Sequence, residues 1–147
     1  MSNREITEIR PGVAAIIRDT RNRILLHHRR VGMGWAPVSG HVEAGESLTG
    51  ALHREVREET GLDVRIEGVV SVNSDPAFQV VDFPDGRRVQ FVTTLFACRS
   101  KTTDFVGSDE GLEWAWFQPD ALPVPLLPYA KVWLADALAI GGAPFIR

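Results

Sequence analysis

The stretch GHVEAGESLTGALHREVREETGL, residues 40–62, decides the fold of this chain. Ser47 is a suitable N-cap and Gly61 a suitable C′ residue, so the stretch predicts a helix over residues 48–60. Apolar side chains recur there at helical spacing and form one stripe: Leu48, Ala51, Leu52 and Val56. We therefore expect this helix to pack one face against a core.

The same helix carries three glutamates close together. Glu55, Glu58 and Glu59 are three or four residues apart, or adjacent. Like charges at a separation of three or four residues on a helix repel by roughly 0.2–0.5 kcal/mol per pair. Two interpretations are open on the helix alone. Either the carboxylates form a solvated patch beside Arg54 and Arg57, or a divalent cation binds against them.

Length and charge narrow the class of protein. With 147 residues, of which 44% are hydrophobic, we expect a single domain over residues 1–147. The net charge of −3 and the scattered Lys and Arg argue against binding to polymeric nucleic acid or to a membrane. The N-terminal residues do not resemble a signal peptide. Because Cys98 is the only cysteine, an intrachain disulfide is excluded and a cytoplasmic location is expected.

Strand patterns surround the helix. Short apolar or alternating runs predict strands over residues 13–18, 23–29, 35–38, 64–74 (broken at Gly68), 78–83, 87–99 and 113–118. Polar turns predict hairpins between the first two strands and around residues 84–86. A last helix is predicted from Tyr129 to Ile140. This order predicts an α/β protein of the α+β type, with helices on both faces of a central mixed β-sheet.

The opening stretch also contains the pattern of a known family. Gly40 is followed after five residues by Glu46, and after seven more by REVREETGL, residues 54–62. This resembles the Nudix box at every fixed position, and the similarity extends to residues 13–30 and 113–123. By this resemblance the chain is identified as a member of the Nudix hydrolases. The resemblance implies an α/β/α sandwich and the hydrolysis of a diphosphate that is linked to another group.

The chemistry of the glutamates agrees with that resemblance. Divalent cations offset the charge that keeps water from attacking a diphosphate, and Mg²⁺ prefers hard oxygen ligands. Glu55 and Glu59, one turn apart, can hold one ion, while Glu58 can hold a second ion or accept a proton. The resemblance implies that all three ligate Mg²⁺, or Mn²⁺ in its place, together with a main-chain carbonyl near Gly40. Glu58 and Glu59 are also candidates for the general base.

Other residues are expected to support the site. Arg54, four residues before Glu58, is expected to orient the box carboxylates, and Glu46 is a candidate for the same role. The family often supplies a further acid just before a late W-x-W-F strand. Here the candidates are Asp109, Glu110 and Glu113, and Glu110 is preferred as a catalytic residue.

Substrate-binding candidates come from several segments. Arg29 and Arg30 end a strand and suit phosphate, while His41 follows the loop glycine. Trp35 is a candidate to stack on a base, and other aromatic candidates are Phe78, Phe83 and Tyr129. For each of these side chains, packing or solvent exposure without a function is the alternative.

The box specifies a diphosphate and leaves the attached group open. A nucleoside di- or triphosphate is the first choice, and ADP-ribose or a nucleotide sugar is the alternative. Pro76 lies fourteen residues past Leu62, close to a spacing of about fifteen that hints at ADP-ribose hydrolysis in the family. A non-catalytic nucleotide sensor, and an isopentenyl-diphosphate isomerase that uses a catalytic cysteine, are alternatives of other classes. The last helix is a candidate contact for a homodimer or a part of the core.

Overall fold

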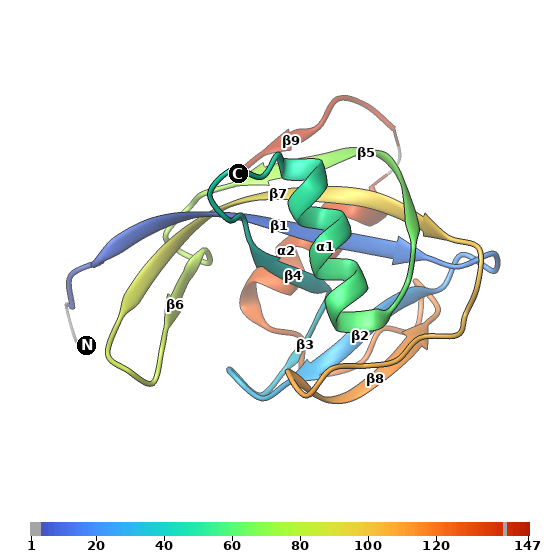
Figure 1. The fold of residues 1–147 in the computed structure, drawn as a ribbon, viewed down its shortest axis with the longest axis horizontal. Coiled ribbons are helices and arrows are strands. Elements are labelled where there is room, and N and C mark those ends of the chain that lie inside the picture. Colours follow the sequence, from blue (N-terminus) through green and yellow to red (C-terminus); the bar gives the residue numbers. More distant parts are fainter. Residues whose placement is uncertain (1–3, 140) are drawn as a thin grey trace.

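The computed structural model describes residues 4–139 and 141–147. Within them nine strands form one mixed sheet with two helices (Figure 1). In chain order the strands are β1 (Glu8–Arg18), β2 (Ile24–Arg29), β3 (Trp35–Ala36), β4 (Val38–His41), β5 (Val64–Asn73), β6 (Val80–Asp82), β7 (Arg88–Ser100), β8 (Gly111–Phe117) and β9 (Phe145–Ile146). The helices are α1 (Leu48–Thr60) and α2 (Pro128–Leu138).

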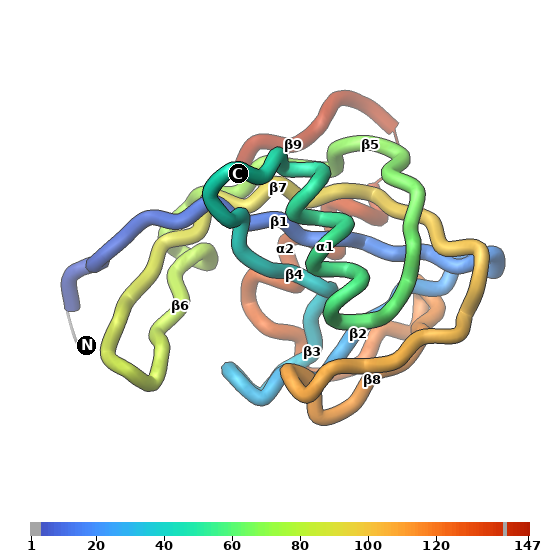
Figure 2. The backbone as a smooth tube through the Cα atoms, viewed as in Figure 1, coloured from blue at the N-terminus to red at the C-terminus, as the bar shows by residue number. Residues whose placement is uncertain are grey.

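Strand β1 is the centre of the sheet. The strand order is β3-β2-β1-β7-β5-β9, while β4, β6 and β8 pair with β1, β7 and β2 respectively. The β1–β7 and β5–β9 pairs are parallel. The β4–β1, β5–β7 and β8–β2 pairs are antiparallel. The path of the chain through this order can be followed in Figure 2. The predicted mixed sheet is confirmed.

Alternation along β1 explains why helices cover both faces. Val13, Ala15 and Ile17 join the core cluster that includes Leu52 of α1. Their neighbours Ala14 and Ile16 join the cluster on the other face, which includes three residues of α2: Ala130, Trp133 and Leu134. Successive side chains of a strand point to opposite faces, so a strand buried on both faces is apolar throughout. Figure 1 shows α1 in front of β1 and α2 behind it.

Both ends of α1 follow the prediction. The Ser47 hydroxyl accepts a hydrogen bond from the Gly50 N–H at 3.0 Å. Gly61 takes the left-handed conformation at φ 72° and donates its N–H to the Arg57 carbonyl. An N-cap of this kind stabilises a helix by about 1 kcal/mol. The helix that carries the glutamates therefore has well-defined ends.

Several predicted elements differ in detail. The hairpin around residues 84–86 is present as β6–β7, with Val81 opposite Val89. By contrast, β1 and β2 pair only at Arg18 and Ile24, and β2 takes β8 as its main partner. The single strand expected over residues 35–38 is divided into β3 and β4, which pair with different strands. The predicted end of the last helix at Ile140 lies outside the described residues.

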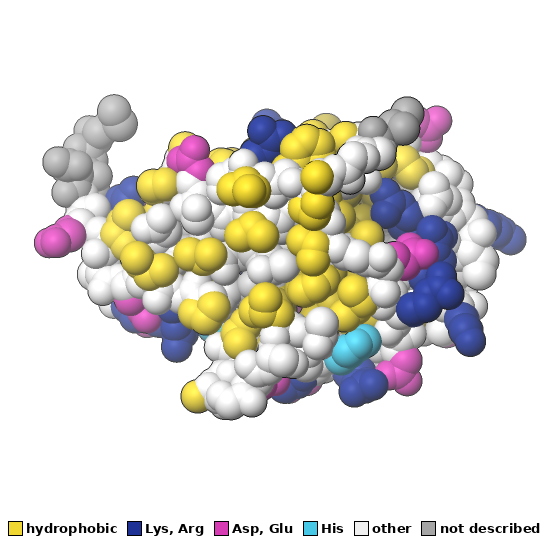
Figure 3. All heavy atoms as spheres, turned by 90° about the horizontal axis from the view of Figure 1, so that it is seen from above, with side chains coloured by type: hydrophobic (Ala, Val, Ile, Leu, Met, Phe, Trp, Pro, Cys, Tyr) yellow, Lys and Arg dark blue, Asp and Glu magenta, His cyan; other side chains and the backbone are white. Residues whose placement is uncertain are grey.

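One face of the molecule shows two distinct kinds of surface (Figure 3). Seen from above in Figure 3, Lys and Arg side chains gather towards one end, while hydrophobic side chains face outward elsewhere. Among the exposed apolar residues of β5 and β9 are Val69, Val72 and Ile146. In the described ranges neither helix has the length and hydropathy to traverse a bilayer.

Leu52→Ala tests the packing of α1. The Leu52 side chain is 1% exposed in the core cluster, so truncation should lower the free energy of unfolding by about 2–5 kcal/mol. Leu48→Ala on the same helix is the control, because Leu48 is 42% exposed and should change stability by much less. Urea unfolding measures both, and equal losses would contradict the described face of α1.

Candidate active site

Two glycines are required by the backbone between β4 and α1, each for a different reason. A Cβ atom placed on Gly40 of β4 would overlap the carboxyl carbon and both oxygens of Glu55. Gly40 is thus required for the close approach of the helix. Gly45, in the loop between β4 and α1, has φ +87°, a conformation that side chains rarely adopt. The two glycines therefore meet two different needs.

Arg54 joins the loop to the helix. Its guanidinium donates two hydrogen bonds to the Glu46 carboxylate, at 2.7 and 2.9 Å, and one to the His41 carbonyl at 2.9 Å. It also donates to Glu55 at 3.0 Å and to Glu58 at 3.3 Å. The Arg54 side chain and the Glu43 N–H lower the pKa of Glu46 to about 2. Arg54 and Glu46 therefore lie where an orienting role requires them.

The three glutamates have very different surroundings. The Glu58 side chain is 60% exposed, whereas the Glu55 side chain is 14% exposed and its pKa is raised by burial. Glu59 is 3% exposed, and neither carboxylate oxygen has a partner at hydrogen-bond geometry. Burial, followed by neighbouring Glu110, raises the pKa of Glu59 to about 10. A solvated patch therefore describes Glu58 but not Glu59.

The donor set fits a hard divalent cation. An unpartnered buried carboxylate is costly, and a cation beside it would offset that cost. Within residues 4–139 and 141–147, no three His, Cys, Asp or Glu side chains are arranged as a ready-made metal cage. The Arg54 guanidinium instead donates hydrogen bonds to one carboxylate oxygen of Glu55 and one of Glu58. Since Mg²⁺ usually keeps several waters, a few carboxylates suffice to hold it, and Glu55 and Glu59 fit that requirement.

Glu110 is the acid that the structure brings to these glutamates. The proton held by Glu59 lowers the pKa of Glu110, and the Arg29 guanidinium acts in the same direction. Glu110 also lines the cavity that Glu55 lines. Glu113 is exposed on β8, and Asp109 engages Arg30 through its main chain. Of the three candidate acids, Glu110 is the one that lines this cavity.

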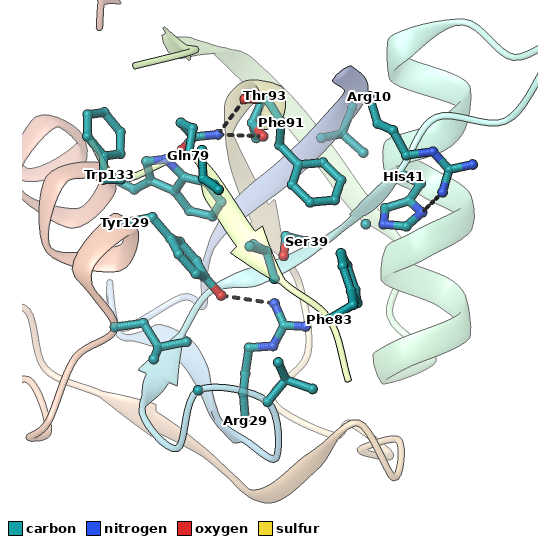
Figure 4. Close-up of a pocket in the computed structure, with 18 of the residues that line it drawn as sticks. Arg10, Arg29, Ser39, His41, Gln79, Phe83, Phe91, Thr93, Tyr129 and Trp133 are labelled. Carbon is teal, nitrogen blue, oxygen red and sulfur yellow. Dashed lines mark hydrogen bonds between the residues drawn. The ribbon is translucent and has the colours of Figure 1, made fainter. Parts of the chain in front are cut away.

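A cavity of about 960 Å³ opens beside the glutamates. Its aromatic lining is Phe78, Phe83, Phe91, Tyr129 and Trp133. Figure 4 shows the Arg29 guanidinium pointing towards Tyr129, and its Nη1 donates to the Tyr129 hydroxyl at 2.9 Å. Arg10 and His41 lie on the opposite side, with Arg10 Nη1 and His41 Nδ1 3.3 Å apart. The cavity thus combines cationic and aromatic walls with one acidic edge.

Of the predicted substrate-binding residues, all except Trp35 line the cavity. Arg29, Arg30 and His41 line the cavity. The Arg30 Nε atom is engaged by the Asp109 carbonyl at 2.6 Å. The structure corrects the prediction for Trp35. Its side chain is 8% exposed and belongs to the core cluster beneath α2. It is not among the residues that line the cavity, so it is not placed to stack on a base.

Sequence reasoning missed Arg10, Gln79, Phe91 and Trp133 as lining residues. Buried Gln79 connects two of them, because its amide donates to the Phe91 carbonyl and accepts from the Trp133 indole. These residues come from β1, β7, α2 and the segment before β6. No local pattern relates them, and strand pairing together with the packing of α2 brings them to one cavity.

Cys98 does not reach the site. It is fully buried in the cluster that packs under α1, and burial raises the pKa of its thiol to about 12. A thiol of that kind is a structural hydrophobe and is not poised as a catalytic acid or base. The isomerase alternative therefore lacks its required cysteine.

Comparison with known proteins places the chain in a family. The NUDIX domain pattern matches residues 8–138, and the chain belongs to the Nudix family. Nucleoside triphosphatase NudI of Salmonella schwarzengrund is 33% identical over 90 residues, which cover 60% of this chain and 64% of that protein. The match thus spans less than two thirds of the curated relatives' length.

Solved structures share the fold. A NUDIX hydrolase from Nitrosomonas europaea has a TM-score of 0.71 at 23% identity, covering 94% of this chain and 78% of that one. An ADP-ribose pyrophosphatase from Streptococcus suis has a TM-score of 0.68 at 22% identity, covering 94% and 98%. At these identities the likeness defines the fold alone.

Stability of the metal-free protein should depend on pH through Glu59. Because the folded pKa of about 10 lies above the ordinary 4.5, folded Glu59 keeps a proton that the unfolded chain releases. This contribution is full below about pH 4.5 and is lost as pH rises towards 10. The free energy of unfolding in EDTA should therefore fall with pH more steeply for the wild type than for Glu59→Gln. Urea unfolding at pH 5 to 9 measures this, and parallel curves would contradict it.

Proposed function

We propose that the protein is a metal-dependent pyrophosphohydrolase. It hydrolyses a phosphoanhydride bond in a nucleoside diphosphate linked to another group, by attack of water at phosphorus. The observation that carries this proposal is the buried carboxyl group of Glu59 next to Glu110, which together with Glu55 lines a large cavity with cationic and aromatic walls. Membership of the Nudix family supports it.

We assign the metal ligands to Glu55, Glu58 and Glu59, together with a main-chain carbonyl near Gly40. When bound, Mg²⁺, or Mn²⁺ in its place, neutralises charge on the diphosphate and lowers the pKa of water. Because Glu59 is buried, its carboxyl group is shielded from bulk water. Exposure of Glu58 leaves it free to reorient from Arg54 towards the cavity.

Glu110 is our first candidate for the residue that accepts the proton from the attacking water. It lines the cavity, and its pKa is lowered, so it is ionised near neutral pH. Its carboxylate is next to Glu59, at the acidic edge of the cavity. Glu58 is the second candidate for this role.

The cavity walls suit a nucleotide. Ligand pockets typically measure about 300–1,000 Å³, and this cavity lies within that range. The Arg29 side chain lines the cavity, and a guanidinium there suits a phosphate oxygen. Phe83 and Phe91 offer ring faces for a planar base. The relative named a nucleoside triphosphatase supports a nucleoside di- or triphosphate as the substrate.

ADP-ribose or a nucleotide sugar is the second candidate substrate. The segment from Ala77 to Phe83, directly after Pro76, forms one wall of the cavity. The Pro76 position thus bears on the shape of the pocket. The fold neighbour named an ADP-ribose pyrophosphatase is in line with this alternative.

Glu59→Gln and Glu55→Gln should each lower kcat by at least about 100-fold with Mg²⁺, because positioning and charge neutralisation dominate phosphoryl transfer. Glu113→Gln is the matched control, since Glu113 is exposed on β8 and should leave the rate unchanged. Steady-state release of phosphate or pyrophosphate measures the rates, and chelation of the metal should abolish them. A near-normal rate for Glu59→Gln would remove this metal assignment.

A substrate panel decides between the two candidate classes. Purified protein with Mg²⁺ is compared on nucleoside triphosphates, nucleoside diphosphates, ADP-ribose and nucleotide sugars. We expect the highest kcat/KM for a nucleoside di- or triphosphate. Faster turnover of ADP-ribose than of every nucleoside triphosphate would overturn that preference, and inactivity on the whole panel would overturn the proposed function.

A further inference from the structure

The segment that carries Glu110 has no regular secondary structure of its own. Residues 107–110, here named the Glu110 loop, lie between β7 and β8. We propose that Trp114 and Arg30 are positioning residues that hold this loop and thereby direct Glu110 into the active-site cavity. The inference rests on the proposed function, because it concerns the acid assigned there.

Three consecutive carbonyl groups of the loop accept hydrogen bonds from these two residues. The Trp114 indole Nε1 donates to the Ser108 carbonyl at 3.1 Å. The Arg30 Nε donates to the Asp109 carbonyl at 2.6 Å, and the Arg30 main-chain N–H donates to the Glu110 carbonyl at 3.2 Å. Hydrogen bonds therefore connect the backbone on both sides of the Glu110 side chain to β8 and to Arg30, the residue that follows β2.

The loop also lies flush against the indole. A Cβ atom on Gly107 would overlap the Trp114 ring. One on Gly111 would lie 2.8 Å from Trp114 Nε1 and 2.9 Å from His27 Nδ1. Real Cβ contacts are not this short, so both glycines are required by the close packing. The indole thus supports the segment on each side of Glu110.

His27 supports the indole from beneath. Its ring stacks on Trp114 with centroids 4.3 Å apart and an interplanar angle of 25°, and the two residues are opposite each other in the β2–β8 pair. His27 is 1% exposed, and burial lowers its pKa to about 4. It is neutral near pH 7, so it forms an uncharged platform. The contacts run without a break from the sheet to the Glu110 loop.

The neighbouring Trp116 provides a matched comparison. It is two residues along the same strand, and its indole Nε1 donates to a loop carbonyl too, that of Thr103, at 3.0 Å. Thr103 does not line the cavity. If Trp114 served only general packing of β8, replacing either indole by a phenyl ring would have similar consequences.

The experiment compares Trp114→Phe with Trp116→Phe. Phenylalanine keeps a ring on His27 but loses the N–H that binds Ser108. We expect Trp114→Phe to lower kcat by about tenfold with KM changed less than about twofold, because a small displacement of a catalytic group is costly. Trp116→Phe should retain the wild-type kcat. Arg30→Gln should likewise lower kcat rather than raise KM, which separates holding the loop from binding phosphate.

Two further measurements decide the role. In a Glu110→Gln background, Trp114→Phe should cause no additional loss, because the acid that it positions is already absent. Amide hydrogen exchange of Arg30, whose main-chain N–H donates to the Glu110 carbonyl, should become faster in Trp114→Phe and not in Trp116→Phe.

Several outcomes would overturn the inference. A tenfold loss that persists in the Glu110→Gln background would do so, as would unchanged exchange of the Arg30 amide in Trp114→Phe. Full activity of Glu110→Gln would also overturn it, while a low rate for Glu59→Gln would still support the proposed function. Exchange needs no turnover, so it tests the hold on the loop even if the substrate panel fails.

Discussion

The guanidinium of Arg54 is the contact on which the geometry of the site depends. It joins the loop, through Glu46 and the His41 carbonyl, to the helix, through Glu55 and Glu58. Stacked glutamates on a bare helix would repel one another, and one planar cation with several donors offsets that repulsion at fixed angles. The carboxylate of Glu55 is consequently held over Gly40, where only a glycine leaves room for it.

Burial gives neighbouring carboxylates different chemistry. Glu58 is largely exposed, Glu55 is mostly covered, and Glu59 is enclosed beside Glu110. Burial raises the pKa of Glu59, whereas Glu59 itself and the Arg29 guanidinium lower the pKa of Glu110. Pairs of titratable groups whose environments separate their pKa values are typical of acid–base sites. The same environments make Glu59 costly to ionise until a cation is beside it, which links the charge of this group to metal binding.

Local signals account for the parts of this structure that the sequence could predict. The caps of α1 and the turn around Gly86 depend on residues within a few positions, so both were readable. Outside the β6–β7 hairpin the partner of each strand was not readable, because alternation shows which face is buried but not which strand is adjacent. Trp35 was misplaced for this reason, since only the β2–β3 pair and α2 bury it. The roles assigned to the glutamates remain predictions that the geometry supports.

The register of β1 completes the argument, because it assembles the cavity wall from distant segments. Parallel pairing with β7 sets Arg10 opposite Phe91 and Gly12 opposite Thr93, while antiparallel pairing with β4 sets Gly12 opposite His41. A slip of one residue would turn every side chain of β1 to the other face. The same slip would remove Arg10 from His41 and would exchange the two sets of apolar side chains that pack on the α1 and α2 faces. Core packing and the cationic wall are thus fixed by one register.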